Sequence, residues 1–507
     1  MPVEIGEHLT IADVVRVARE RAEVALSPHA RERVARSRAM VEQLVREGRA
    51  VYGITTGVGE LAGVRISPEQ SAVLQVNIVR SHSAGVGEPL PEEVVRAMML
   101  LRAHTLALGY SGVREDILVI LLRMLNRGLH PVIPSQGSVG ASGDLAPLAH
   151  LALALIGEGE VMVAGRRMPS RDALAAAGVL PALLMAKEGV ALINGTQAMT
   201  AIGALAVFDA RWLATSADIS GGMSFEALRG LPDALDPLLQ RVRPHPGQEA
   251  SAGNLRRLIA GSEILAEPRQ NGKVQDAYAL RCMPQVHGAS RDAIAYAGTV
   301  VEVEMNAATD NPLIFSDEGR VISGGNFHGQ PVAIAMDLLA IAAAELASIA
   351  ERRIERLVNP HLSGLPAFLT ADGGLHSGLM LAQYTAAALV SENKVLSHPA
   401  SVDSIPTSAN QEDHVSMGTI AARKAAQVVL HAQQAVGIEL ICAAQALEFH
   451  RPAQPGAGTR RAYESVRDGV PRLENDRVLA DDLARGAELV ISGRLIARVE
   501  DSIGRLA

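Results

Sequence analysis

The 507-residue chain contains few aromatic residues and only two cysteines. Phe, Tyr and Trp make up 3% of the residues, against 48% for all hydrophobic types, so the core must be filled mainly by Ala, Leu, Val and Ile. Two cysteines are too few for the disulfide framework of a small secreted protein. Because Cys282 and Cys442 lie in apolar stretches, we expect both to be free, buried thiols in a reducing cytoplasm.

The chain also lacks a run of about 20 apolar residues without a charge, which a membrane-spanning helix would need. The best candidate, 331–350, carries Asp337 and Glu345 and so predicts a buried helix of a bundle. The first ten residues have acidic groups where a signal peptide has basic ones, which favours a cytoplasmic protein. A net charge of −8 argues against a nucleic-acid partner, and the 15 histidines show no metal-binding spacing. We therefore expect no membrane, nucleic-acid or metal partner.

Long helical patterns are the main feature that is present. Residues 10–26 predict an amphipathic helix with Thr10 as its N-cap. Apolar residues recur at helical spacing in 331–357, 377–396 and 415–449. At a rise of about 1.5 Å per residue, the last of these would be about 50 Å long. Long helices with broad apolar faces are typical of a helical bundle.

The N-terminal part of the chain has a different character. Glycine-rich stretches at 51–65 and 130–145 lie between its helical segments, and loops of this kind often carry function. We therefore predict a mainly α fold with two domains. A loop-rich N-terminal domain, 1–200, would hold the active site, and a C-terminal helical bundle, 201–507, would mediate oligomerisation.

Two shorter segments complete this division. The stretch 451–458, with two prolines and two glycines, predicts a loop before a terminal helical hairpin. The charged run 351–356 predicts a solvated face or a contact between subunits. The chain shows no internal repeat and no low-complexity segment.

The segment GSVGASGDLAPLAH, residues 137–150, contains three small residues in a row, Ala141, Ser142 and Gly143. Three small residues allow a backbone to fold back and react with itself. The amide nitrogen of Gly143 can attack the carbonyl carbon of Ala141 and close a five-membered ring. Loss of water from the ring, and of the Ser142 hydroxyl as a second water, would leave an exocyclic methylidene. Such a group is an electrophile, which enzymes normally take from a cofactor.

Other glycine-rich motifs do not fit this segment. Gly137, Gly140 and Gly143 read GxxGxxG, whereas a dinucleotide-binding loop reads GxGxxG. No Gly-Lys-Ser/Thr follows, as it would in a P-loop, and the GxSxG spacing of a nucleophile elbow is absent. An ordinary turn is the alternative for an isolated Ala-Ser-Gly. The wider sequence favours the reactive loop.

The wider sequence resembles the aromatic amino acid ammonia-lyases and, within them, the histidine ammonia-lyase family. The resemblance extends from about residue 51 to about residue 447, and chance agreement across so many ordered blocks is negligible. The blocks are VYGITTGVG (51–59), SHSAGVG (81–87), GSVGASGDLAPLAH (137–150), EGVALINGTQAM (188–199), VQDAYALRCMPQVHGA (274–289), MNAATDNPLIF (305–315), SGGNFHGQP (323–331) and SVDSIPTSANQEDHVSMG (401–418).

The resemblance implies the long-helix fold of the fumarase/aspartase-like superfamily and a homotetramer whose active sites are shared between subunits. It also implies that Ala141-Ser142-Gly143 matures into 4-methylideneimidazol-5-one, with no external cofactor. The implied activity is loss of ammonia from L-histidine to give trans-urocanate, the first step of histidine degradation. Whether the amine or the imidazole ring of the substrate meets the electrophile stays open.

Tyr52 matches the family's catalytic base, which removes the β-proton of the substrate. At its usual pKa of about 10, a tyrosine needs nearby cations or helix dipoles to act as a base near neutral pH. The same loop reads Gly-Val-Gly at 57–59, where many relatives have Gly-Phe-Gly. Val58 removes aromatic bulk beside Tyr52, which we expect to loosen loop closure or alter the edge of the pocket.

The resemblance implies roles for five further residues. Arg281 matches the residue that grips the substrate carboxylate, which a guanidinium can do with two parallel hydrogen bonds. Gln275 and Tyr278 share its segment. Gln275 is expected to bind the substrate, and Tyr278 is expected close to the prosthetic group as a catalytic residue. Asn194 is expected to hydrogen-bond either the prosthetic carbonyl or the amine, and Phe327 to wall the pocket.

Selectivity for histidine is expected from Ser81, His82 and Glu412. Ser81 and His82 occupy the position where related tyrosine lyases have His-Leu and phenylalanine lyases have Phe-Leu, and a polar histidine suits an imidazole substrate. Related phenylalanine lyases have glutamine in place of Glu412. A carboxylate can hold an imidazole N–H and assist proton transfer, but would be left unpaired beside a phenyl ring. The alternative for Glu412 is a buried ion pair with a basic neighbour.

Other functions compete with this interpretation. A tyrosine or phenylalanine ammonia-lyase, or an aminomutase of the same family, is disfavoured by Ser81, His82 and Glu412. A catalytically silent helical assembly protein would have lost Ser142 or Tyr52, and this chain has both. A fumarase-type lyase would carry the signature GSSxMPxKxN, which is absent.

Overall fold

The computed structural model describes residues 2–57, 63, 65–267 and 274–507 of the chain. These residues form two compact units, and each unit is assembled from three segments of the sequence. The first break lies close to the predicted boundary at residue 200, but neither unit is one continuous stretch as 1–200 and 201–507 would be. The first unit consists of Met1–Phe208, Gly298–Asp337 and Pro399–Arg423, and the second of Asp209–Ala297, Leu338–His398 and Lys424–Ala507.

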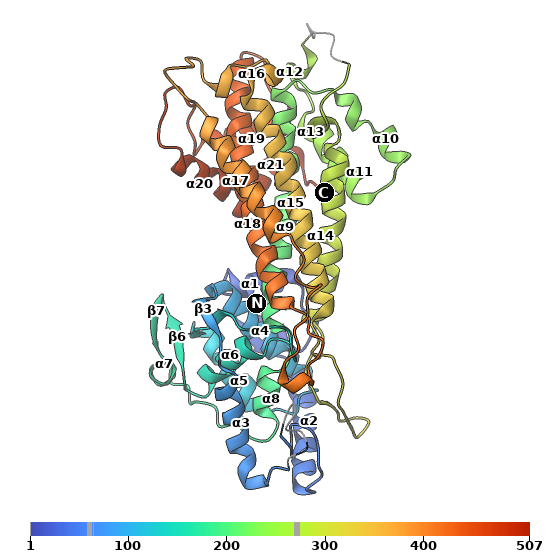
Figure 1. The fold of residues 1–507 in the computed structure, drawn as a ribbon, viewed down its shortest axis with the longest axis vertical. Coiled ribbons are helices and arrows are strands. Elements are labelled where there is room, and N and C mark those ends of the chain that lie inside the picture. The colour runs from blue at the N-terminus through green and yellow to red at the C-terminus, as the bar shows by residue number, and fades with distance from the viewer. Residues whose placement is uncertain (1, 58–62, 64, 268–273) are drawn as a thin grey trace. The chain divides into compact units, whose positions relative to one another are not determined.

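Short helices and small sheets make up most of the first unit (Figure 1). The strands pair as β1–β2 in parallel and as β3–β5, β4–β6–β7 and β8–β9 in antiparallel. The elements that lie wholly in this unit are β1 (Val3–Ile5), α1 (Ile11–Ala18), β2 (Val24–Leu26), α2 (Pro28–Arg46), α3 (Pro68–His82), β3 (Val86–Pro89), α4 (Glu92–Ala107), α5 (Glu115–Asn126), β4 (His130–Pro131), β5 (Pro134–Gln136), α6 (Leu145–Leu155), β6 (Glu160–Val163), β7 (Arg166–Pro169), α7 (Ser170–Ala176), α8 (Glu188–Ile193), β8 (Leu313–Phe315), β9 (Arg320–Ile322) and a 3₁₀ helix, Ser408–Asn410.

The second unit is built from helices. Four long helices begin in one unit and end in the other along the chain: α9 (Gln197–Ala227), α14 (Met283–Met305), α15 (Gln330–Val358) and α18 (Gly418–Leu447). The elements wholly in the second unit are α10 (Pro237–Arg241), α11 (Pro246–Leu258), α12 (Glu263–Ala266), α13 (Tyr278–Arg281), α16 (Pro360–Ser363), α17 (Met380–Leu396), α19 (Ala457–Arg467), α20 (Ala480–Ile491), α21 (Arg494–Ile503) and 3₁₀ helices at Pro232–Leu235, Ala367–Leu369 and Glu448–His450.

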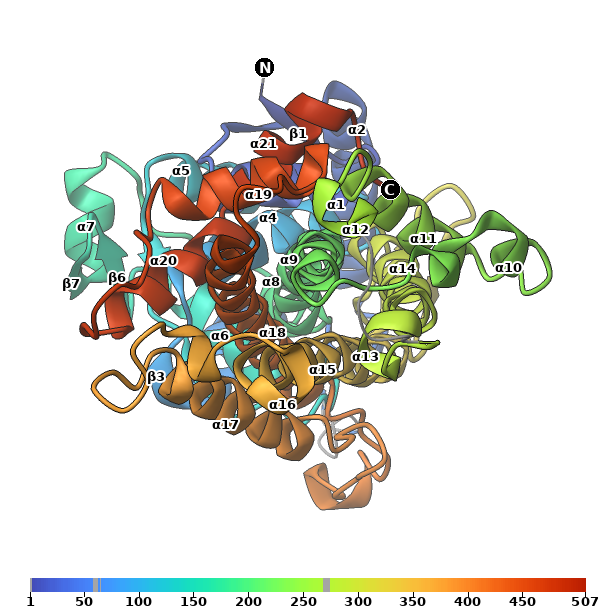
Figure 2. The ribbon, with the colours of Figure 1, turned by 90° about the horizontal axis from the view of Figure 1, so that it is seen from above.

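The predicted mainly α fold is confirmed, and so are its long helices. The patterns at 331–357, 377–396 and 415–449 correspond to α15, α17 and α18. In the second unit, α9, α15 and α18 run side by side in both views (Figures 1 and 2). Leu339 and Leu346 of α15 are both fully buried. They lie on the same face of the helix, because residues seven positions apart are two turns apart. The bundle therefore follows from the aliphatic periodicity of the sequence.

Among the described residues, α15 is the one helix long and apolar enough to cross a membrane by length and composition. Of its most apolar 18-residue window, 67% is buried inside the structure. The core helix of a soluble protein passes the same test, so this is weak evidence for a membrane span. Asp337 and Glu345 interrupt the apolar sequence of the helix.

The predicted N-terminal helix is shorter than expected. Thr10 caps α1 as predicted: its hydroxyl accepts from the backbone of Asp13, whose carboxylate accepts in turn from the backbone of Thr10. The helix ends at Ala18 and not at residue 26. Arg21 adopts a left-handed φ of 56°, and the chain then enters β2, which pairs with β1. Strand pairing thus ends a pattern whose periodicity alone predicted further helix.

The prediction of a solvated or inter-subunit face at 351–356 fits only part of the run, in which Arg352 is exposed. Glu351 and Arg353 are buried, and Arg353 pairs with Glu439 of α18 at 2.5 Å with both side chains fully buried. Glu439 also accepts hydrogen bonds from Ser220 (2.8 Å) and Ser224 (2.6 Å) of α9. A charged run can thus lie inside a bundle when partners from other helices satisfy each group.

Two smaller expectations also need correction. The tail holds α19, α20 and α21, where a helical hairpin was predicted, although 451–458 does contain the break before α19. Both cysteines are free, but only Cys442 is buried, whereas Cys282 is half-buried. Burial raises the pKa of the Cys442 thiol, which keeps it protonated.

Candidate active site

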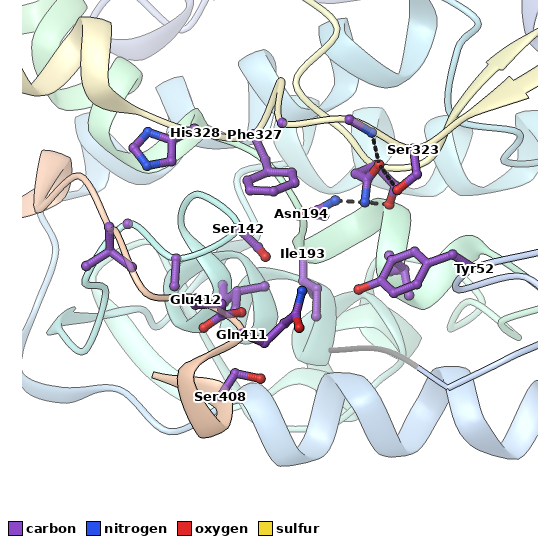
Figure 3. Close-up of a pocket in the computed structure, with 18 of the residues that line it drawn as sticks. Tyr52, Ser142, Ile193, Asn194, Ser323, Phe327, His328, Ser408, Gln411 and Glu412 are labelled. Carbon is purple, nitrogen blue, oxygen red and sulfur yellow. Dashed lines mark hydrogen bonds between the residues drawn. The ribbon is translucent and has the colours of Figure 1, made fainter. Parts of the chain in front are cut away.

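The first unit contains a cavity of about 830 Å³ (Figure 3). Seven of the predicted site residues line it: Tyr52, His82, Ala141, Ser142, Asn194, Phe327 and Glu412. The sequence carries them in separate loops and helix ends, and the fold brings them together. Further lining residues include Ile78, Leu145, Val190, Ile193, Asn311, Ser323, His328, Ser408, Gln411, Asp413, His414 and Val415.

The Ala141-Ser142-Gly143 segment forms a tight turn before α6. Gly140 and Gly143 pair as an isolated bridge, so the backbone reverses direction at Ala141 and Ser142. Ser142 has a φ of 51°, a left-handed conformation that costs a non-glycine residue about 1–2 kcal/mol. Backbone strain of this kind persists where the surrounding structure imposes it, and it gathers at functional sites.

The turn is pressed against the segment that follows α8. The backbone N–H of Gly195 donates to the carbonyl oxygen of Ser142 (3.2 Å), and the N–H of Asp144 donates to the carbonyl oxygen of Gly195 (2.7 Å). Gly143 has a φ of 77°, and a Cβ on it would overlap that same carbonyl of Gly195. Only glycine therefore fits at position 143, which is the nitrogen donor of the predicted cyclisation.

Asp144 fastens the turn to the first residues of α9. One oxygen of its fully buried carboxylate accepts from the backbone N–H groups of Ala198 and Met199, both at 2.9 Å. The other accepts from the hydroxyls of Ser138 (3.2 Å) and Thr419. Burial raises the pKa of Asp144, and these hydrogen bonds oppose the rise. An anion at the start of a helix is stabilised by the unpaired N–H groups and the helix dipole.

Arg102 holds the other side of this arrangement. Its fully buried guanidinium donates to the carbonyl oxygens of Ala191 (2.8 Å) and Asn194 (2.9 Å) at the end of α8, and to the side chain of Gln197 (2.5 Å). Burial lowers the pKa of Arg102 to about 10, so it remains a cation near neutral pH. A cation suits the C-terminal end of a helix, where carbonyl groups lack helical partners.

Asn194 ends α8 and faces the cavity from a nearly buried position. Its side-chain nitrogen donates to Asp310 Oδ1 (3.3 Å) and to the carbonyl oxygen of Asn311 (3.1 Å), the second of which Figure 3 shows. Asp310 in turn pairs with Lys187 at 2.6 Å, with both side chains fully buried. Both partners of the Asn194 nitrogen are acceptors, so the orientation of the amide is fixed, with Oδ1 on the opposite side.

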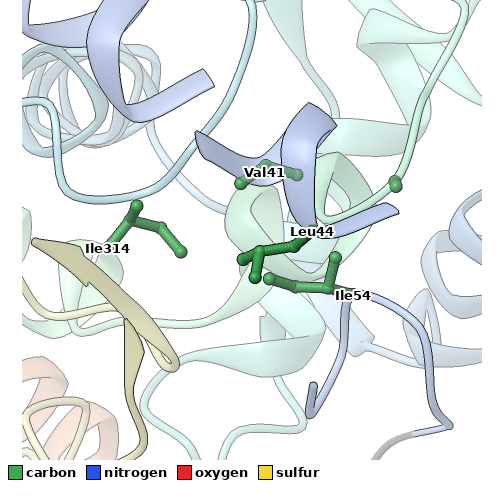
Figure 4. Packing of buried hydrophobic residues seen from close by; sticks show 5 residues of the cluster. Val41, Leu44, Ile54 and Ile314 are labelled. Atoms are coloured by element: carbon green, nitrogen blue, oxygen red, sulfur yellow. The ribbon is translucent and has the colours of Figure 1, made fainter. Parts of the chain in front are cut away.

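Tyr52 extends its hydroxyl into the cavity from the glycine-rich loop (Figure 3). Threonine hydroxyls stabilise this loop: Thr55 accepts from the backbone of Val51 (2.9 Å), and Thr56 from the backbone of Gly53 (3.3 Å). Two residues beyond Tyr52, Ile54 is fully buried in an apolar cluster with four residues from other elements (Figure 4). The other members are Val41, Leu44, Ala186 and Ile314. Val58 lies outside the described residues.

His82 lines the cavity at the end of α3, whereas Ser81 is exposed and does not line it. The His82 Nδ1 atom lies 2.8 Å from the carbonyl oxygen of Ile78 and 3.0 Å from the Ser81 hydroxyl. A carbonyl can only accept, so Nδ1 carries the proton and donates it. In the neutral ring, Nε2 is then a hydrogen-bond acceptor.

Glu412 is presented by a loop with unusual backbone conformation. The preceding residues Ser408, Ala409 and Asn410 all have positive φ, between 51° and 69°. The loop is closed by two backbone hydrogen bonds between Thr407 and Glu412 and by the Thr407 hydroxyl, which donates to Glu412 Oε2 at 2.7 Å. No basic residue in the described part of the chain pairs with Glu412, which disfavours the ion-pair alternative.

The other predicted residues lie elsewhere in the chain's structure. Gln275, Tyr278 and Arg281 belong to the second unit and do not line this cavity. Gln275 and Tyr278 are exposed, the latter by 69%, and the Arg281 guanidinium lies 4.6 Å from the centre of the Tyr278 ring. Phe327 lines the cavity.

Sequence reasoning missed several polar residues at the cavity. The backbone carbonyl of Asn311 accepts from the Asn194 side chain, and the side-chain oxygen of Asn311 accepts from the backbone N–H of Gly324 (2.9 Å). His328 contacts the carbonyl of His414 at 3.0 Å, and their rings stack with centroids 6.0 Å apart. The motifs TDNP and QEDH contain two of these residues and could have marked them. The described part of the chain contains no group of three or more His, Cys, Asp or Glu arranged to hold a metal.

The chain resembles known proteins over nearly its whole length. Residues 9–468 match the aromatic amino acid lyase family. The chain is 60% identical to a histidine ammonia-lyase of Symbiobacterium thermophilum over 99% of both chains. Its structure resembles a histidine ammonia-lyase from Trypanosoma cruzi (TM-score 0.93, 45% identity, 99% and 95% of the two chains) and a tyrosine aminomutase from Streptomyces globisporus (0.96, 40%, all of both chains). These neighbours confirm the predicted fold.

Proposed function

From the premise that the chain belongs to the aromatic amino acid lyase family, we propose that it removes ammonia from L-histidine to give trans-urocanate. The observation that carries the proposal is the cavity in which the strained Ser142 turn lies together with Tyr52, His82 and Glu412. The reaction breaks the bond between the α-carbon and nitrogen and removes one β-proton. Electrons neither enter nor leave the substrate, so the chemistry needs an electrophile and a base.

The Ala141-Ser142-Gly143 turn fits a self-formed 4-methylideneimidazol-5-one ring. Formation requires the nitrogen of Gly143 to bond to the carbonyl carbon of Ala141, with loss of one water, followed by loss of the Ser142 hydroxyl as a second. The tight turn and the absence of room for a Cβ at Gly143 support this assignment. The ring would supply an electrophile that ordinary side chains lack.

Asn194 is suited to hold the substrate amine. Both hydrogens of its side-chain nitrogen are donated to Asp310 and Asn311, so Oδ1 is the atom left to contact a ligand. An amide oxygen accepts hydrogen bonds and can bind the α-ammonium group, whereas it cannot donate to a prosthetic carbonyl. Of the two roles expected for Asn194, the geometry favours the amine.

Tyr52 would then take the β-proton. Its hydroxyl points into the cavity from a loop anchored by the buried Ile54, which limits the positions that the phenol can adopt. A base acts efficiently when it is held within hydrogen-bond reach of the proton it removes. The buried anchor thus supports a catalytic role for Tyr52.

His82 and Glu412 would recognise the imidazole ring of the substrate. His82 Nε2, in the neutral ring, and the Glu412 carboxylate are both acceptors, and the substrate imidazole presents one N–H when neutral and two when protonated. A phenyl or phenol ring would leave the carboxylate without that partner inside the cavity, at a desolvation cost. This polarity favours histidine over phenylalanine or tyrosine.

Gln275, Tyr278 and Arg281 would reach the substrate from another subunit. They lie in the second unit, away from the lining of the cavity, and the family resemblance implies shared active sites in a homotetramer. In such an assembly, Arg281 would bind the substrate carboxylate. Size measurement of the purified protein, with activity restored by mixing inactive Tyr52 and Arg281 variants, would test this sharing.

The decisive experiment follows urocanate absorbance after L-histidine is added to the purified protein and to a Ser142→Ala variant. We expect product only from the unchanged protein, with the same oligomeric size for both. A fully active Ser142→Ala variant would refute the proposed electrophile. Product from tyrosine or phenylalanine, and none from histidine, would instead favour a related lyase or aminomutase. The structural similarity to a tyrosine aminomutase is the reason to include these substrates.

A further inference from the structure

Lys187 and Asp310 form an ion pair directly behind the cavity, although neither residue lines it. Both side chains are fully buried, the atoms Nζ and Oδ2 are 2.6 Å apart, and the residues are 123 positions apart in the sequence. Burial lowers the pKa of Lys187, and Asp310 opposes that effect. Burying two charges is costly, so a pair retained at this position calls for an explanation beyond stability.

The second oxygen of Asp310 connects the pair to the cavity. Asp310 Oδ1 accepts from the side chain of Asn194 (3.3 Å) and from the backbone N–H of Asn311 (2.6 Å). An ionised carboxylate can only accept, so it requires Asn194 to turn its NH₂ group inward. Lys187 occupies the remaining oxygen.

Lys187 and Asn194 connect the two ends of α8 to the carboxylate of Asp310. Lys187 is the N-cap residue of α8, with a left-handed φ of 75°, and Asn194 is the C-cap residue. The six residues of α8 lie between the two, which are therefore about 10 Å apart along the helix axis. The lysine side chain reaches Asp310, which binds Asn194, so the short helix is held at its beginning and at its end.

We infer that the Lys187–Asp310 pair is a positioning device that fixes the Asn194 amide with its oxygen toward the substrate amine. The inference rests on the proposed function, because it assigns the amine to Asn194. The pair touches neither the substrate nor the reacting atoms. It determines which kind of hydrogen-bonding group the cavity offers to the nitrogen that leaves.

Asp310→Asn tests the inference because it changes which group faces Asn194. The Lys187 ammonium only donates and is charged, so it would take the oxygen of the new amide in preference to the neutral N–H of Asn311 and leave the NH₂ facing Asn194. The Asn194 side chain would then have to rotate and present its own NH₂ to the substrate ammonium, where two donors meet. In a Ser142→Ala background, which removes turnover, equilibrium binding can be measured for L-histidine and for deaminohistidine, which lacks the amine.

We expect Asp310→Asn to weaken L-histidine binding by about ten- to a hundredfold, and deaminohistidine binding by less than about threefold. Equal weakening of both ligands, or no weakening of either, would overturn the inference. If the Ser142→Ala protein with native residues 187 and 310 binds neither ligand, the proposed function itself fails, which is a separate result.

Two charge-neutral double variants keep the test decisive if a lone buried lysine prevents folding. In Lys187→Met with Asp310→Leu, position 310 offers the Asn194 nitrogen no acceptor, so the amide is no longer fixed and the selective loss of histidine binding should persist. In Lys187→Met with Asp310→Asn, no lysine draws the oxygen of the introduced asparagine away from Asn194, and Asn194 can return to its original orientation. Histidine affinity should then recover to within about threefold of the background. Identical behaviour of the two doubles would overturn the inference.

Discussion

Gly143→Ala should disable the site through backbone geometry alone. The substitution adds a single uncharged methyl group at a residue whose φ is 77°. That methyl would lie closer than 3.0 Å to the carbonyl oxygen of Gly195, a distance that Cβ atoms do not adopt. Either the segment that contains Gly143 or the segment that contains Gly195 must therefore move.

The cost can be worked from the contacts that the movement breaks. An alanine in the left-handed region costs about 1–2 kcal/mol relative to glycine. Separation of the strands removes the hydrogen bonds from Asp144 to Gly195 and from Gly195 to Ser142, at about 1 kcal/mol each. We therefore expect a loss of about 3–4 kcal/mol of folding stability, together with loss of ring formation, because the attacking nitrogen is displaced.

Gly165→Ala provides a matched control. Gly165 also has a φ of 77°, but a Cβ there would meet nothing within 4 Å, so its variant should lose only the backbone cost of about 1–2 kcal/mol. Thermal unfolding midpoints, urocanate formation and the near-ultraviolet difference spectrum against Ser142→Ala would be compared for both variants. Equal midpoints for the two variants, with activity retained in Gly143→Ala, would refute the close-approach argument.

Two further substitutions test selectivity and acid stability. Glu412→Gln should lower kcat/KM for L-histidine by about ten- to a hundredfold, because the side chain loses its charge. The unfolding midpoint should not change, because glutamine keeps an oxygen that accepts from Thr407. Unchanged turnover of L-histidine would exclude the imidazole-binding role. Burial alone raises the pKa of Asp218, but the Arg291 charge and the hydrogen bond from His287 outweigh it and hold that pKa well below its usual value. Its contribution to stability is therefore present above about pH 4 and lost as the pH falls. The Asp218→Asn variant should be less stable than the unchanged protein near neutral pH and should lose less stability on acidification. Thermal unfolding midpoints of both proteins over a pH series would test this, and equal pH dependence would contradict it.

The parts of the structure that sequence predicts best are those determined by local pattern. Aliphatic periodicity predicts α15, α17 and α18 to within a few residues, and Thr10 caps its helix as its residue type suggests. The Ala141-Ser142-Gly143 turn is also visible, since three consecutive small residues precede an apolar helix. Such features depend on neighbours within one or two helical turns, which a single sequence displays.

Features that depend on distant partners are not visible in the pattern. The charged run at 351–356 contains Arg353, whose burial is explained only by Glu439 on another helix, 86 residues away. The end of α1 depends on β2 pairing with β1. Asp310 appears in the sequence as a turn residue before proline, and its pairing with Lys187 follows only from the fold. Burial and partners, not residue type, decide the role of these charged groups.

Buried charged residues outside the cavity hold the strained Ser142 turn, so that the cavity itself stays open. Arg102, Asp144, Lys187 and Asp310 are all fully buried, none of them lines the cavity, and their formal charges sum to zero. Arg102 and Asp310 bind Asn194, Lys187 binds Asp310, and Asp144 fastens the Ser142 turn to α9, so together they fix the backbone that carries Ser142 and Asn194. Neutrality of the set limits the penalty of burying it. Substitutions among these four should therefore act by changing geometry, whereas substitutions among the cavity residues should act on the chemistry itself.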